Sequence, residues 1–170
     1  MDRLDRISAA AAVILAVWAL LLVVFVERQP PRRHQKEQQV VRVDPAFDKK
    51  VSLVKNLLAG NNLDQAEALL VEMVANYPYE AMPFFLRGDL LLYRQDAIGA
   101  MMEYRKAVDL NPDFLDKKSE LFQGKKIKKT VEEARAMIEP GLAAKQDDGA
   151  LLAARAVYYY MLRKIAGSCG

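Results

Sequence analysis

The sequence of 170 residues contains a single cysteine, Cys169, and a single histidine, His34. One cysteine excludes an intrachain disulfide framework and a cysteine-rich zinc site. One histidine excludes multi-histidine metal centres and argues against histidine-based catalysis. Glycine and proline are scarce, at 8 and 7 residues, which excludes a fibrous or low-complexity chain. Because aromatic residues make up only 8%, stacked nucleic-acid platforms are not favoured.

Groups that could form a catalytic site are equally scarce. The paired carboxylates Glu132-Glu133 and Asp147-Asp148 fall where helices are expected to begin, and acids at that position favour the helix dipole. The sequence offers no nucleophile–base pair and no glycine-rich phosphate cradle. We therefore expect no enzyme, no catalytic residue, no metal, no cofactor and no small-molecule substrate.

The apolar residues are concentrated near the N-terminus. Residues 7–26 read ISAAAAVILAVWALLLVVFV, twenty residues without a charge. As a helix, this run would span about 30 Å, the thickness of the hydrocarbon core of a bilayer. The residues after it lack the small-residue cleavage site of a secretory signal peptide. We expect a short N-tail over 1–6 and a retained single-pass transmembrane helix over 7–26.

One face of the expected span carries small residues at a spacing of four, Ser8, Ala12 and Ala16. This spacing lets another transmembrane helix approach closely, although alanine is also common in membrane helices without such a contact. A basic linker over 27–43 follows. Two bases precede the span and five follow it, so the positive-inside rule places the C-terminal part on the cytoplasmic side of the membrane. We expect a bacterial inner membrane, and the periplasmic side is the alternative.

The rest of the chain has the periodicity of helices. Asp44-Pro45 is typical of a helix start, and Gly60-Asn61-Asn62 is typical of a helix end. Asp64 and Glu67 have the spacing of a capping box that would open the next helix. The expected helices lie at about 44–59, 64–77, 80–94 and 97–110.

These four helices form two pairs that repeat with a period of 34 residues, which is typical of a helical array. Small residues would let the helices of a pair pack closely, and the prolines would end each second helix. The equivalent positions are Leu57 and Leu91, Ala66 and Ala100, Leu70 and Tyr104, Met73 and Ala107, and Pro78 and Pro112.

Residues 47–114 resemble the tetratricopeptide-repeat (TPR) family. The second pair matches that family's signature at Phe84, Gly88, Leu91, Ala100, Tyr104, Ala107 and Pro112. The first pair is more degenerate, because Lys50, Val54 and Met73 replace the usual aromatic, glycine and alanine. The resemblance implies an α-solenoid in which the first helix of each pair lines a concave groove for a protein or peptide segment.

Position by position, the resemblance implies six groove residues: Lys55, Leu58, Phe85, Asp89, Leu92 and Tyr93. Burial of Leu92 and Tyr93 under the C-terminal helices is the alternative for those two. The Lys/Asn clamp that some family members use for terminal carboxylates is not matched, since Lys55 and Asp89 hold its key positions. We expect an extended segment or helix held by apolar packing and one or two polar pairs.

The two repeats over 44–114 are expected to need a cap, because two repeats rarely form a stable stack. Thr130 and Glu133 have capping-box spacing, and Pro140-Gly141 should kink or end the helix that they open. A last helix is expected at about 149–165. We interpret residues 130–170 as a divergent helix pair that caps the stack.

A lysine-rich connector over 115–129 joins the repeats to this pair. It is suited to anionic lipid or an acidic protein, and a solvated charge run is the alternative. Without a recognised binding motif, nucleic acid is not an expected partner. The basic patch consists of Lys117, Lys118, Lys125, Lys126, Lys128 and Lys129.

Together these patterns predict an all-α protein, with a single transmembrane helix followed by a short TPR-like solenoid of antiparallel helix pairs. The expected function is that of a membrane-anchored adaptor or scaffold that binds a protein segment and assists assembly of a membrane protein complex. Two alternatives remain: a fixed accessory subunit of a larger membrane complex, and a lipid-surface module that uses the basic stretches.

Overall fold

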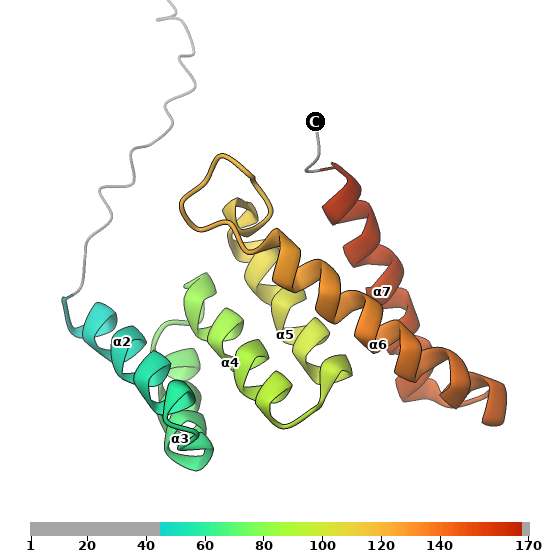
Figure 1. Cartoon of the computed structure of the whole chain (residues 1–170), viewed down its shortest axis with the longest axis horizontal. Coiled ribbons are helices and arrows are strands. Elements are labelled where there is room, and N and C mark those ends of the chain that lie inside the picture. The colour runs from blue at the N-terminus through green and yellow to red at the C-terminus, as the bar shows by residue number, and fades with distance from the viewer. Residues whose placement is uncertain (1–44, 168–170) are drawn as a thin grey trace, which may run out of the picture. The chain divides into compact units, whose positions relative to one another are not determined.

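The computed structural model describes residues 45–167, and all regular structure in that range is helical, as predicted. Consecutive helices run in alternating directions and stack as neighbouring pairs (Figure 1). The elements are α2 (Pro45–Ala59), α3 (Leu63–Asn76), α4 (Ala81–Tyr93), α5 (Ala97–Leu110), the 3-10 turn η1 (Pro112–Phe114), α6 (Gly124–Ala144) and α7 (Gly149–Gly167).

The predicted N-tail, transmembrane helix and linker lie outside the described residues, as do Ser8, Ala12 and Ala16. Within residues 45–167, none of the helices combines the length and the apolar character needed to cross a bilayer.

The predicted 34-residue period is present in the packing. Ala66 and Ala100 are both fully buried, and so are Leu70 and Tyr104. Ala66 and Leu70 belong to the core of the first pair, and Ala100 and Tyr104 belong to the larger core. The sequence period therefore reflects equivalent core positions.

The turns inside the two pairs are also equivalent. Asn61 and Gln95 both adopt left-handed backbone, with φ of 55° and 62°. In the first turn the backbone N–H of Asn62 donates to the backbone carbonyl five residues earlier at 2.8 Å. In the second turn the backbone N–H of Asp96 does the same at 2.9 Å. The chain thus reverses in the same way at positions 34 residues apart, which fixes the same antiparallel pairing twice.

Two hydrophobic cores hold the helices together. The smaller core joins α2 and α3 to Leu86 and Leu90 of α4. The larger core runs from α4 through α5, η1 and α6 to α7. Because α4 contributes to both, it is the element that connects the first helix pair to the rest of the stack.

The predicted capping box at the start of α3 is wrong. Asn62 precedes α3, and no side-chain hydrogen bond caps this helix. Asp64 and Glu67 instead accept hydrogen bonds from the Arg94 guanidinium at 3.2 and 2.8 Å. The hydrogen bond from Arg94 lowers the pKa of Glu67. These acids therefore link α3 to the end of α4, a long-range pairing that sequence spacing does not reveal.

The predicted start of the sixth helix is also wrong. α6 begins at Gly124, six residues before Thr130, so the connector is shorter than expected. Thr130 is buried, and its hydroxyl donates to the carbonyl of Lys126 at 3.1 Å. Pro140 does not end the helix, which continues to Ala144. A Cβ at Gly141 would lie 2.6 Å from Leu151, so glycine there lets α7 pack against α6.

Candidate interaction groove

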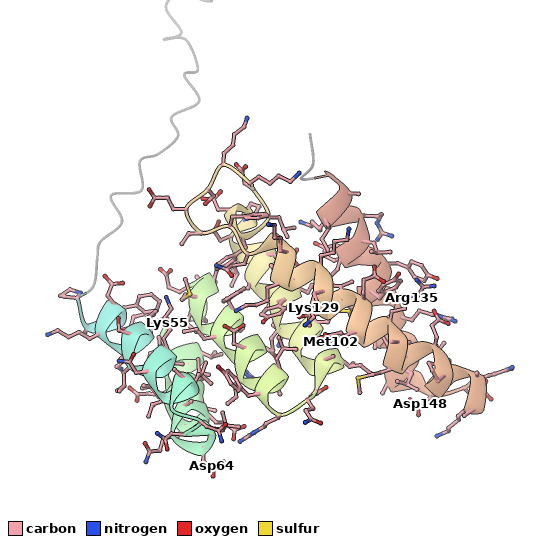
Figure 2. All side chains as sticks on the ribbon, viewed as in Figure 1. Lys55, Asp64, Met102, Lys129, Arg135 and Asp148 are labelled. Carbon is pink, nitrogen blue, oxygen red and sulfur yellow. The ribbon has the colours of Figure 1, made fainter. Side chains whose placement is uncertain are left out.

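Side chains from α2, α4 and α6 surround a hollow of about 360 Å³. Five of the six predicted groove residues line it: Lys55, Leu58, Phe85, Asp89 and Tyr93. Figure 2 shows Lys55 on α2 and Lys129 on α6, with α4 between them. Five residues that the family resemblance implies for a groove therefore lie around one hollow.

The sixth predicted residue, Leu92, lines an adjoining hollow of about 280 Å³ between α4 and α6. This second hollow shares Asp89, Tyr93 and Lys126 with the first. We use "the groove" for the two hollows together. Tyr93 is 52% exposed, so it is not buried under the C-terminal helices.

The floor of the groove is aromatic and tightly packed. The Phe85 ring stacks on Tyr104 with 5.0 Å between centroids and on Phe114 with 4.8 Å. All three side chains are buried, with at most 5% exposure. Stacked and buried rings of this kind hold the floor of the groove rigid, which lowers the entropic cost of binding.

The side chain of Asp89 on α4 accepts hydrogen bonds from α5 and α6. It accepts a hydrogen bond from the Tyr104 hydroxyl and two from the Lys126 ammonium, at 3.0 and 3.1 Å. Burial, followed by the negative charge of Asp89, raises the pKa of the Tyr104 phenol. Lys126 also lies 5.1 Å from the centre of the Phe85 ring. The charge of Asp89 is therefore compensated within the protein and is not free to recruit a basic partner.

Two charged side chains of the first hollow have no such compensation. Lys55 on α2 and Glu120 in the connector are both exposed, and neither has an ion pair within residues 45–167. They line the same hollow from different elements. An occupant of the hollow would meet one free positive and one free negative charge.

The connector forms a wall of the groove, which sequence reasoning missed. Glu120, Leu121 and Gln123 line the first hollow. The backbone N–H of Gln123 donates to the backbone carbonyl of Phe114 at 2.8 Å, which closes the connector into a loop. The apolar segment Leu121-Phe122 between lysines was the available signal. Met82 and Phe114 also line the groove without having been predicted.

The six lysines of the predicted basic patch differ in their partners and in the elements that carry them. Lys126 is bonded to Asp89, and Lys129 pairs with Glu133 at 3.5 Å, both in the groove. Lys125 and Lys128 are exposed on a neighbouring face of α6. The remaining two, Lys117 and Lys118, are exposed in the connector.

The described part of the chain holds no group of three or more His, Cys, Asp or Glu side chains placed to bind a metal ion. In comparisons with known proteins, no family profile, no curated protein and no solved structure matches the chain.

Proposed function

We propose that the protein is a membrane-anchored adaptor of the TPR type, which binds a segment of a partner protein in the groove. The observation that carries this proposal is the gathering of Lys55, Phe85, Asp89 and Tyr93 around one hollow. The resemblance of the sequence to the TPR family implies the same residues for a groove. The equivalent turns of the two helix pairs support the same repeat architecture.

The chemistry of the groove defines the bound segment. Phe85 and Phe114 favour an apolar anchor side chain, because burial of such a side chain contributes about 1.5–3 kcal/mol. Lys55 and Glu120 favour an acidic group near α2 and a basic group near the connector. Opposite charges on different walls would fix the direction in which the segment lies.

Site-specific photo-crosslinking in intact cells tests the proposal. A photoreactive amino acid replaces Tyr93 in the groove or, as a matched control, Tyr159. Tyr159 is 50% exposed on α7, a helix that contributes no side chain to the groove. We expect a discrete protein adduct from position 93 only, weakened by Lys55→Glu. Equal adducts from both positions, or none from position 93, would contradict the proposal.

A further inference from the structure

A hollow of about 430 Å³ that is separate from the groove lies between the end of α5, η1 and the last turns of α7. Val108, Pro112 and Leu115 make its apolar wall, and Tyr160, Arg163 and Lys164 face them from α7. No carboxylate is among the described side chains that line it. The hollow therefore combines a largely apolar interior with a basic edge.

One of the two bases at this edge has an ion pair within residues 45–167, and the other has none. Lys164 pairs with Asp109 at 3.3 Å and lies 5.4 Å from the centre of the Tyr160 ring. Arg163 is exposed and has no ion pair within residues 45–167. Its charge is thus available to an anion beside the apolar wall.

The connector carries two more bases that are close in sequence to this hollow. Lys117 and Lys118 are the second and third residues after Leu115, which lines the hollow, and both are exposed. Two acids are equally close in sequence, Asp113 and Asp116, and the Asp116 carboxylate accepts the Lys118 backbone amide at 2.9 Å. Together with Arg163, three bases without an ion pair among the described residues stand against these two acids, so this edge has an excess of one positive charge.

The chain enters the helix stack at this same end. Consecutive helices alternate in direction. The N-terminus of α2 at Pro45 therefore lies on the same side of the stack as the C-termini of α5 and α7 (Figure 1). Tyr79, between α3 and α4, lies there too and is 87% exposed. Exposed tyrosine suits a membrane interface, where its ring is apolar and its hydroxyl is hydrated.

We propose that this end of the helix stack docks on anionic phospholipid. Arg163, Lys117 and Lys118 contact lipid phosphates, while the apolar hollow covers the adjoining glycerol and upper acyl region. The proposal rests on the membrane anchor proposed above. The expected linker of 17 residues reaches at most about 60 Å when extended, so the domain stays close to the membrane surface.

Fluorescence quenching of the full chain in lipid nanodiscs tests this docking. Cys169, the only cysteine, follows two positions after Gly167 and accepts an environment-sensitive fluorophore. A nitroxide on the lipid headgroup quenches the fluorophore only at close range. We expect strong quenching in nanodiscs that contain phosphatidylglycerol, weak quenching in phosphatidylcholine alone, and loss of the difference at high salt.

Two double variants provide the matched comparison. Arg163→Gln with Lys118→Gln removes two bases of the docking edge and should lower the ratio of docked to undocked domain by about thirty-fold. Lys145→Gln with Arg155→Gln removes two bases near the start of α7, at the opposite end of the stack, and should leave quenching unchanged.

The outcomes separate the docking from the anchor. In one outcome the full chain incorporates stably into nanodiscs while quenching does not change with lipid charge or with the Arg163 and Lys118 substitutions. That result would overturn the docking but not the anchor. Failure of the full chain to remain in nanodiscs would overturn the anchor and the docking with it.

Discussion

At the scale of single residues, close approaches decide which positions tolerate change. Gly88 on α4 lies against the Tyr104 ring of α5, and a Cβ there would be 2.5 Å from a ring atom. The ring is held in place by stacking on Phe85, so it has little room to move. This contact explains in physical terms why position 88 is occupied by glycine.

Gly88→Ala should therefore lower the free energy of unfolding by about 1–3 kcal/mol, because an overpacked core forces side chains and backbone apart. Denaturant titration measures the change. Gly149→Ala is the control, since a Cβ there meets no atom within 4 Å. Equal effects of the two substitutions would show that the close approach is not what matters.

Tyr104 predicts how stability depends on alkaline pH. Its phenol has a raised pKa in the folded protein, first because of burial and then because of Asp89. In the unfolded chain, the phenol loses its proton near its ordinary pKa of 10.0. The unfolded state then holds fewer protons than the folded state, so stability should fall as pH rises above about 10.

Thermal melts across this pH range can test the prediction against the variant Tyr104→Phe. The variant lacks the phenol and should lose less stability than the natural protein as the pH rises. A parallel decline in both proteins would assign the alkaline sensitivity to other groups.

At the scale of elements, α2 to α5 were predictable because the helical periodicity of the apolar residues and the 34-residue period agree. The start of α6 was not, because the capping-box spacing at Thr130 also occurs inside a helix, where Thr130 bonds to the preceding turn. The groove residues on α2 and α4 were implied by the resemblance to a known repeat family. The connector wall did not, since it depends on the long-range hydrogen bond between Gln123 and Phe114.

The pairing of Asp89 with Lys126 joins α4 to α6 and supplies the next prediction. Lys126→Gln should lower stability by about 1 kcal/mol, because it leaves Asp89 with 15% side-chain exposure and no cationic partner. Lys125→Gln removes an exposed lysine one position away and should change stability by less than about 0.5 kcal/mol.

Urea unfolding of the two variants, each also combined with Asp89→Asn, measures the coupling directly. If the loss caused by Lys126→Gln is the same in both backgrounds, the two helices are not held together by this pair.

At the scale of the whole described region, the two cores are unequal. The core of α2 and α3 contains eight buried residues, whereas the core that extends to α7 contains eighteen. In stacked helical repeats, each unit is stabilised mainly by its neighbours, so a unit at the end with a small core opens more easily.

Hydrogen exchange should therefore be faster in α2 and α3 than in α5 and α6. Leu70→Ala should accelerate exchange in the first helix pair, because Leu70 is fully buried in the smaller core, and should leave α6 nearly unchanged. Exchange followed by mass spectrometry resolves these helices. Uniform acceleration across all helices would mean that the described region opens as one unit.

The central claim is that the groove holds a partner segment, and the most direct measurement is the affinity of the full chain for a synthetic peptide spanning the crosslinked segment. Tyr93→Ala removes a half-exposed aromatic side chain from the rim of the groove and should weaken binding about thirty-fold, as expected for a hot-spot residue. Tyr159→Ala removes an equally exposed tyrosine from α7 and should leave the affinity unchanged. Equal affinities for both variants and the natural protein would contradict the account.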